Sequence, residues 1–240
     1  MDFEWPAELE KLRVEADEVA AEAAAGLDSR EDSWINGHSR EFSAELGERG
    51  WLGMTWPTEY GGHGRSALER FVVFEAMIGH GAPIAASWFC DRQMGPSLLA
   101  FGTEDQRRRF LPDMIAGTAA WCIGMSEPDA GSDLASLRTR ARRDGDEFVV
   151  NGQKVWTSFA ARADWCYLIC RTDPEARAHE GLSELVVAMD SPGITVVPIT
   201  DMTAGSHFCE VVFEDVRVPA SHLVGELNGS WKQTMRQLEH

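Results

Sequence analysis

The sequence predicts an α+β multidomain protein, in which an all-helical part is followed by a β-rich part and then by the start of another helix. Two observations indicate the helical part: apolar side chains at helical spacing near the N-terminus, and two helix-capping motifs farther along. The third is a change of character near residue 120, after which short strand-like runs alternate with turn signals. From about Gly229 the sequence becomes helical again.

The helical elements can be placed from their spacing and their caps. Leucine, alanine and valine recur on one face between residues 7 and 27. Ser66-Ala-Leu-Glu69 is a capping box, in which the side chain of each end residue bonds the backbone N–H of the other, and it predicts a helix to about Gly79. Thr103-Glu-Asp-Gln106 is a second capping box, and Pro112 is expected to limit or kink the helix that it opens.

The β-rich part is expected to contain six or more short antiparallel strands, which suggests a barrel or a sandwich. Leu137 to Arg142 alternates apolar or small residues with arginine, as a half-buried strand does, and Asp144-Gly145 lies in the turn that follows. Phe148 to Trp156 is interpreted as two short strands around Asn151-Gly152, because Asn-Gly is the strongest short hairpin signal. Further strands are expected over residues 165–171, 184–189, 194–199 and 208–213.

Composition places the chain among ordinary soluble globular proteins, with 44% hydrophobic and 25% charged residues. No apolar run approaches the roughly 20 residues of a membrane span. The acidic N-terminus lacks the basic and apolar regions of a signal or transit peptide. A formal net charge of −17 argues against non-specific binding to nucleic acid or to anionic membranes. We therefore expect a cytoplasmic protein without a nucleic-acid partner.

The five cysteines and seven histidines show no spacing typical of a metal site or a disulfide framework. The number of cysteines is odd and no Cys-x-x-Cys spacing occurs, so reduced, buried thiols are expected. Cys166 and Cys170 have the same parity in a predicted strand and are expected to pack on one side of it. No metal is predicted.

The most informative segment runs from Ile123 to Asp133 and reads IGMSEPDAGSD. Gly124 and Gly131 permit close approach of the backbone to a ligand, and successive N–H groups in such a loop can hold an anion. Ser126 and Ser132 add hydroxyls that can bond a heteroaromatic ring or a phosphate. An ordinary turn between two domains would use the same residues, so the loop alone leaves both interpretations open.

A second segment, Lys154-Val-Trp-Thr-Ser158, places an indole beside two hydroxyls at the end of a predicted strand. The indole of Trp156 can pack beside a flat ring system, and the hydroxyls of Thr157 and Ser158 can bond the edge of that ring. The alternative is a core tryptophan at the end of a barrel. Glu127 and Asp133, in the first segment, are interpreted as carboxylates that stabilise their loop, with a catalytic pair as the alternative.

The two segments resemble the flavin-contacting segments of the acyl-CoA dehydrogenase family, with IGMSEPDAGSD as the flavin loop and NGQKVWTS as the second segment. Further stretches resemble family segments in the family's order, at residues 51–62, 102–112 and 208–219. The resemblance extends from about residue 40 to residue 240. It implies a helical N-terminal domain over 1–120, an antiparallel β-barrel domain that binds flavin over 121–227, and the start of a C-terminal helical domain over 228–240.

The resemblance implies FAD as the cofactor. It assigns cofactor contacts to Ile123, Gly124, Met125, Ser126, Gly131, Ser132, Trp156, Thr157 and Ser158. Within this set, Met125 and Ser126 would meet the isoalloxazine ring, and residues 156–158 would lie against the flavin. Gly131 and Ser132 would meet the pyrophosphate, with Ser132 also near the acyl-CoA substrate.

The implied reaction is α,β-dehydrogenation of an acyl-CoA thioester to a trans-2-enoyl-CoA, by loss of an α-proton and transfer of a β-hydride to flavin N5. Electron-transfer flavoprotein is the implied electron acceptor, and a dimer or tetramer of like or unlike subunits is the implied assembly. Two alternatives share the motifs: a non-catalytic partner subunit of a heteromeric complex, and another flavin reaction, as an oxidase or monooxygenase.

Two features depart from the family pattern. The family carries its catalytic glutamate in a C-terminal helical domain, so the base is expected beyond His240, with Glu239 as the candidate within this sequence. Thr157-Ser-Phe-Ala160 replaces a commoner Thr-Asn-Gly pattern. This replacement looks more like bacterial members that act on branched, cyclic or steroid-side-chain thioesters in lipid breakdown.

Overall fold

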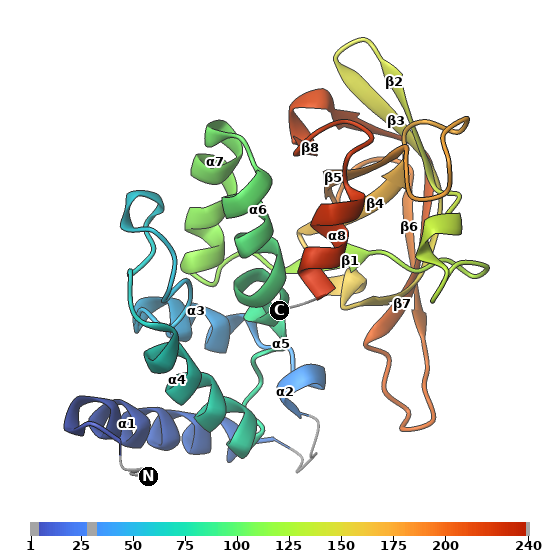
Figure 1. Cartoon of the computed structure of the whole chain (residues 1–240). Coiled ribbons are helices and arrows are strands. Elements are labelled where there is room, and N and C mark those ends of the chain that lie inside the picture. The colour runs from blue at the N-terminus through green and yellow to red at the C-terminus, as the bar shows by residue number, and fades with distance from the viewer. Residues whose placement is uncertain (1–4, 28–32, 239–240) are drawn as a thin grey trace. The chain divides into compact units, whose positions relative to one another are not determined.

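A computed structural model describes residues 5–27 and 33–238. The chain forms two compact units (Figure 1). The first comprises residues up to Asp91 together with Arg108–Thr118, and the second comprises Arg92–Arg107 and the residues from Ala119 onward. The domain boundaries expected after residues 120 and 227 stay predictions.

The first unit is helical, as predicted. Its elements are α1 (Ala7–Ala24), α2 (Ser33–Asn36), α3 (Arg40–Glu48), a 3₁₀ turn (Thr58–Tyr60), α4 (Ala67–His80) and α5 (Ala85–Phe89). The first capping box is confirmed, because the Glu69 N–H donates to Ser66 Oγ at 3.2 Å and the Ser66 N–H donates to Glu69 Oε2 at 2.8 Å. Leu46, Trp51 and Met77 are among the buried side chains of its core.

The second unit also contains helical segments. A π-helical turn (Cys90–Met94) leads into α6 (Gly95–Phe101), followed by α7 (Glu104–Ile115), which contributes residues to both units, and by α8 (Trp231–Leu238). The second capping box is confirmed by reciprocal bonds of 3.0 and 3.2 Å between Thr103 and Gln106. Pro112 lies inside α7, which continues to Ile115, so the proline does not end the helix. Helix α8 confirms the predicted return to helix.

The second unit is built on one sheet, which confirms the predicted β domain. Its strands are β1 (Trp121–Gly124), β2 (Arg140–Asp144), β3 (Glu147–Ser158), β4 (Trp165–Arg171), β5 (Leu182–Ala188), β6 (Ile194–Ile199), β7 (Phe208–Pro219) and β8 (Leu223–Val224). Their order is β6-β7-β3-β2-β4-β5-β8, with β1 beside β4. Most pairs are antiparallel, but β1 and β2 each pair with β4 in parallel, which corrects the all-antiparallel expectation. Long crossovers precede β4, and parallel pairing requires such connections.

The hairpin predicted at Asn151-Gly152 is wrong, because β3 passes through both residues as one strand. Asn151 Nδ2 donates to Asp215 Oδ1 at 2.9 Å, and the Asp215 N–H donates to Asn151 Oδ1 at 3.0 Å, so this side chain bridges β3 to β7. Gly152 packs against Thr139, whose Oγ1 would lie 2.5 Å from an added Cβ. Tertiary contacts have overridden the local turn signal. The turn predicted at Asp144-Gly145 is confirmed: it joins β2 to β3, and φ at Gly145 is +62°.

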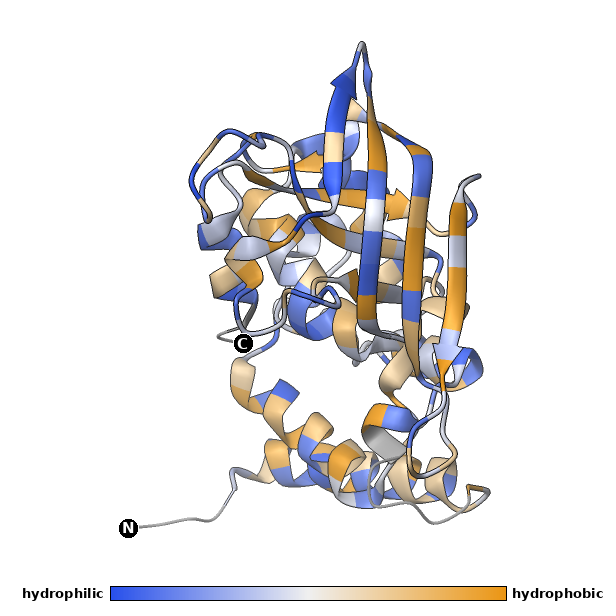
Figure 2. Cartoon of the chain, turned by 90° about the vertical axis from the view of Figure 1, so that its right-hand side faces the viewer, coloured by the Kyte–Doolittle hydropathy of each residue, from blue (hydrophilic) through white to orange (hydrophobic). Residues whose placement is uncertain are grey.

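The main core of the second unit lies on one face of its strands, and a smaller buried cluster that includes Ile169 and Leu182 lies on the other face of β4 and β5. Phe148, Leu168 and Phe213 are among the buried residues of the main core, and hydrophilic and hydrophobic residues alternate along long strands such as β7 (Figure 2). All five cysteines are free and buried, and Cys166 and Cys170 share this core as predicted. In the part of the chain that the structure describes, no helix has the length and apolar character needed to cross a membrane.

We expect alanine to have opposite effects at two glycines. Gly152→Ala forces a Cβ within 2.6 Å of the Thr139 backbone, and such overpacking costs about 1–3 kcal/mol of unfolding free energy. Gly79→Ala, in α4, has nothing within 4 Å of the added Cβ and should stabilise by about 0.5–1 kcal/mol, because glycine is a poor helix residue. Urea unfolding measures both variants. Equal effects of the two variants would contradict the continuous path of β3 through Gly152.

Candidate functional site

The loop that follows β1 is held by the carboxylate of Glu127. Its Oε2 accepts from the Arg138 N–H at 2.6 Å, and its Oε1 accepts from the Thr139 N–H at 2.8 Å. These bonds occupy backbone donors that the predicted strand from residue 137 would have used, and β2 therefore begins only at Arg140. The interpretation as a loop-stabilising carboxylate is confirmed for Glu127; for Asp133, which makes no side-chain bond to the 3₁₀ turn that follows it, the interpretation stays a prediction.

Lys154 joins this loop to β3. Its side chain has no solvent exposure, and its Nζ donates to Glu127 Oε1 and to the Met125 carbonyl oxygen, each at 2.9 Å. The Val155 N–H donates to the Ser126 carbonyl oxygen, also at 2.9 Å. The two segments singled out in the sequence are therefore in direct contact at residues 125–127 and 154–155.

Burial acts differently on the two charges of this pair. Burial alone would raise the pKa of Glu127, but the charge of Lys154 and the hydrogen bonds from Thr139 and Arg138 bring this pKa below its ordinary value. Burial lowers the pKa of Lys154, and the charge of Glu127 opposes that shift. The pair is thus a desolvated ion pair in which each partner requires the other.

Strand β1 delivers the loop to the site. A Cβ added at Gly124 would lie 2.9 Å from a Leu168 methyl carbon and 3.1 Å from Cys166 Sγ, so the close packing of β1 on the core requires glycine here. Ile123 is the register partner of Tyr167 on β4. Met125 and Ser126 follow, both partly exposed.

Trp156 is not the core tryptophan of the alternative interpretation. Its side chain is 57% exposed, and its ring meets Phe208 edge-on with centroids 5.8 Å apart. Its φ of +61° is rare for a bulky residue, and the register between β3 and β7 shifts between Lys154 and Thr157. The bulge presents the indole to solvent, and backbone strain of this kind clusters at functional sites.

Thr157 follows with the opposite environment. Its side chain is 1% exposed, yet its Oγ1 has no hydrogen-bond partner within the described ranges 5–27 and 33–238. Buried hydroxyls are nearly always paired, so this atom marks a place where a ligand can supply the partner. Ser158 is partly exposed beside it.

No described hydrogen bond joins the predicted pyrophosphate contacts, Gly131 and Ser132, to the junction between residues 125–127 and 154–155. Gly131 and Ser132 are exposed, and a Cβ at Gly131 would have no atom within 4 Å. Their assignment to a pyrophosphate stays a prediction. Glu239 lies outside the described residues. Sequence reasoning missed the role of Lys154, although a lysine at the same strand parity as Phe148 and Val150 was a signal for a buried partner.

The sequence matches the family description "Acyl-CoA dehydrogenase, N-terminal domain" over residues 6–118, and "Acyl-CoA dehydrogenase, middle domain" over residues 122–216. The chain therefore belongs to the acyl-CoA dehydrogenase family, which confirms the resemblance seen in its motifs.

Individual relatives agree. Acyl-CoA dehydrogenase FadE26 of Mycobacterium tuberculosis is 44% identical over 204 residues, which cover 84% of this chain and 50% of FadE26. The solved Tcur3481-Tcur3483 steroid ACAD is 42% identical with a TM-score of 0.88, and the match covers 100% of this chain and 62% of that one. The ChsE4-ChsE5 complex from Mycobacterium tuberculosis is 39% identical with a TM-score of 0.87, covering 100% and 61%. The chain thus spans between 50% and 62% of the length of these proteins.

Breaking the buried ion pair should be costly, and breaking both partners together should be less so. Lys154→Met leaves the carboxylate of Glu127 without its cation, and we expect a loss of about 3–5 kcal/mol in unfolding free energy. Adding Glu127→Gln removes the stranded charge, so the double variant should lose less than the sum of the single losses.

Denaturant unfolding of the two single variants and the double variant measures this coupling. Glu147→Gln is the matched control, because its ion pair with Arg217 is exposed and should contribute about 0–1 kcal/mol. Additive losses at Lys154 and Glu127 would contradict the pairing.

The pKa shifts predict a pH dependence of opposite sign for two buried carboxylates. The pKa of Glu127 is lowered, so its contribution to stability is present above its unfolded pKa of about 4.3 and is lost as pH falls through the folded pKa. Burial raises the pKa of Glu184, so stability falls as pH rises from the unfolded pKa through the folded one. Unfolding free energies of Glu127→Gln and Glu184→Gln, measured against pH, should diverge from the wild type with opposite slopes, and parallel curves would refute this assignment.

Proposed function

We propose that this protein binds FAD where residues 123–126 meet residues 154–158 and uses it to dehydrogenate an acyl-CoA thioester. The observation that carries the proposal is the junction made by Lys154, which bonds both the carboxylate and a carbonyl of the first segment. Membership of the acyl-CoA dehydrogenase family supports the cofactor and the reaction class.

The residues present at the junction fit a flavin. The buried and unpaired Thr157 Oγ1 offers a hydrogen bond to the edge of a heteroaromatic ring. The exposed indole of Trp156 offers an apolar face to that ring, and the bulge in β3 turns this indole outward next to the buried Thr157. The polar and apolar groups thus match a ligand that is flat and hydrogen-bonding.

In this proposal Met125 and Ser126 contact the isoalloxazine ring through backbone and side-chain groups, and residues 156–158 lie against it. Gly131 and Ser132 hold the pyrophosphate through backbone N–H groups and a hydroxyl. Ser132 also lies near the acyl-CoA. The Lys154–Glu127 pair touches none of these ligands; it positions the segment that does.

When bound, FAD supplies acceptance of the hydride from the β-carbon of the thioester. This chain's residues orient the two reactants and place hydrogen-bond donors where negative charge develops. No described carboxylate is assigned as the base that takes the α-proton. Glu239 stays a candidate outside the described residues.

A second candidate role is that of one subunit in a heteromeric acyl-CoA dehydrogenase. The similarity to the ChsE4-ChsE5 complex favours it, since that structure pairs two differently named proteins. The similarity to a protein named as a steroid ACAD favours a bulky steroid-side-chain thioester over a straight-chain fatty acyl group. Electron-transfer flavoprotein is the proposed electron acceptor, and the assembly is a dimer or tetramer.

The test uses the full-length protein, alone and with a candidate partner subunit. Visible flavin bands after reconstitution are expected, and their absence would refute the cofactor proposal. Bleaching by an acyl-CoA without consumption of oxygen indicates a dehydrogenase, and consumption of oxygen indicates an oxidase or monooxygenase. Bleaching only when a partner is added supports the subunit role.

The unpaired hydroxyl gives a sharper prediction. Thr157→Val keeps the shape of the side chain and removes the hydroxyl, so FAD should bind roughly fivefold to tenfold more weakly, as expected for one lost hydrogen bond. The unfolding free energy without FAD should be unchanged or higher, because an unpaired buried polar atom is gone. Flavin titration and thermal unfolding measure the two quantities, with the exposed Thr195→Val on β6 as control. Unchanged FAD affinity would remove Thr157 from the site.

A further inference from the structure

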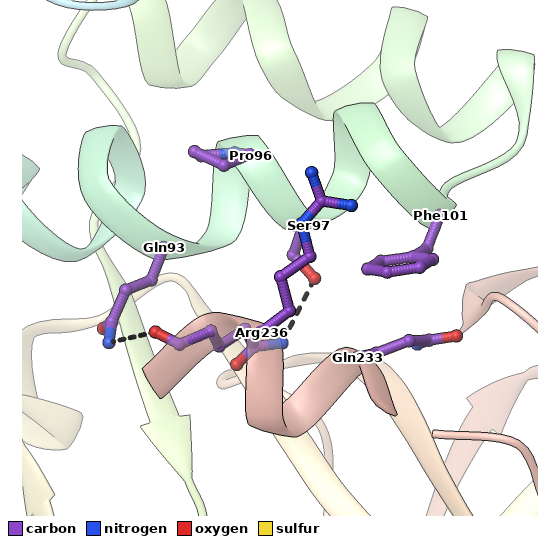
Figure 3. Close-up of a pocket in the computed structure, with 7 residues that line it drawn as sticks. Gln93, Pro96, Ser97, Phe101, Gln233 and Arg236 are labelled. Carbon is purple, nitrogen blue, oxygen red and sulfur yellow. Dashed lines mark hydrogen bonds between the residues drawn. The ribbon is translucent and has the colours of Figure 1, made fainter. Parts of the chain in front are cut away.

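A pocket in the second unit is lined by residues of α6, α8 and the turn before α6 (Figure 3). One wall of it is buried and polar: Ser97 from α6 and Gln233 and Gln237 from α8 are at most 5% exposed. Arg236 lies at its exposed rim, with the guanidinium carbon 5.7 Å from the centre of the Phe101 ring. The hydrogen bonds behind the buried wall determine which ligand chemistry the pocket accepts.

Those hydrogen bonds converge on Glu184 of β5, which has no solvent exposure. Its Oε2 accepts from Tyr167 Oη and from Gln233 Nε2, each at 2.8 Å. Its Oε1 accepts from Thr234 Oγ1 at 2.7 Å and from Gln237 Nε2 at 3.3 Å. An ionised carboxylate only accepts, and four donors occupy its four lone-pair directions.

The donor and acceptor roles in these bonds fix the roles of the side chains that line the pocket. Tyr167 gives its proton to Glu184, so at the 2.9 Å contact with Ser97 the tyrosine oxygen accepts and the serine hydroxyl donates. Ser97 Oγ in turn accepts from Gln237 Nε2 at 3.1 Å. The amide nitrogen of Gln237 therefore uses both hydrogens, on Ser97 and on Glu184. If this amide were turned over, Gln237 Oε1 would face the carboxylate of Glu184, and two acceptors would meet without a hydrogen between them.

The network leaves one atom unmatched at the pocket. Gln237 Oε1 is buried and has no partner among the residues that the structure describes. The hydroxyl hydrogen of Ser97 and both amide hydrogens of Gln237 are already used, and Gln233 Nε2 donates to Glu184 and to the Val224 carbonyl oxygen. The three buried side chains of this wall therefore offer an acceptor and no free donor. Gln93, which also lines the pocket and is partly exposed, donates one amide hydrogen to the Gln237 carbonyl oxygen at 3.3 Å. The donors of Arg236 sit at the exposed rim, where water can satisfy them.

We propose that this pocket is a specificity subsite for a hydroxyl group on the acyl part of the thioester, which donates its hydrogen to Gln237 Oε1. The inference rests on the proposed function, since the pocket would receive the acyl part of the thioester that the proposed reaction uses. Tyr167, behind the wall, is the parallel register partner of Ile123 on the strand proposed to bind the cofactor, so both side chains lie on one face of the sheet. A ketone brings only an acceptor to an acceptor, and a methyl group leaves the amide oxygen unpaired.

The experiment uses the full-length protein with FAD and three matched acyl-CoA series over a range of chain lengths. The series end in a methyl group, in a terminal hydroxyl, or in a methyl ketone. Calorimetric Kd and kcat/KM are both measured. At the length that reaches the pocket, the hydroxyl form should be favoured roughly fivefold to tenfold over both others, as one buried hydrogen bond provides. No hydroxyl preference at any length, or a preference for the ketone, overturns the proposal.

Gln237→Met removes the acceptor at similar volume, and the ratio of hydroxyl to methyl affinity should fall to about one. Lys232→Gln, on the exposed side of the same helix, is the control and should keep the wild-type ratio. A ratio retained in Gln237→Met overturns the assignment of the acceptor. If no thioester bleaches the flavin but the Kd ratio behaves as expected, the dehydrogenase proposal fails and the subsite stands. Equal Kd values refute the subsite whatever the activity.

Discussion

The ion pair between Lys154 and Glu127 is the interaction on which the candidate site depends. Burying two charges is costly unless every polar atom finds a partner. Here the carboxylate also receives the N–H groups of Arg138 and Thr139, and the ammonium also reaches the Met125 carbonyl. The pair therefore sets the path of the loop after β1 and its contact with the end of β3. The exposed Trp156 and the buried Thr157 both stand within three residues of this lysine.

A second buried carboxylate, Glu184, works by a different principle. The described donors around it are neutral groups from α8 and β4. Such a group holds helix α8 against the sheet through oriented hydrogen bonds and has no counter-charge among these partners. The pKa of Glu184 is accordingly raised by burial, whereas that of Glu127 is lowered by its cation and its hydrogen bonds. One carboxylate organises the proposed cofactor segments, and the other organises a pocket on the face shared by Ile123 and Tyr167.

Elements with strong local signals could be predicted from the sequence. The strands Trp165–Arg171 and Ile194–Ile199 have their expected bounds, and both capping boxes form. Features decided by distant contacts could not be predicted. Asn151-Gly152 carries a turn signal, but Asp215 on a strand far along the chain holds it extended.

In the candidate site, too, features with local signals could be predicted and features decided by distant contacts could not. The flavin segments could be recognised from their residue types and from the family pattern, and the stabilising role of Glu127 was anticipated. The partner of Glu127 could not be identified from the sequence, because no residue near Lys154 in the chain indicates that its ammonium bonds residues 125 and 127. The bulge that exposes Trp156 likewise arises from the register between β3 and β7.

The parallel pairing of β1 with β4 has a consequence for the order of assembly. Residues 121–124 have residues 165–168 as their register partners, so closing this pair requires the whole intervening hairpin to be accommodated first. Contacts between residues far apart in sequence carry a loop-closure entropy that must be offset before they stabilise the chain, and they form late and slowly. The strand that delivers the proposed cofactor loop is thus anchored only once β4 is in place. During synthesis, β1 can therefore gain its β4 partner only after the residues up to Arg171 have left the ribosome.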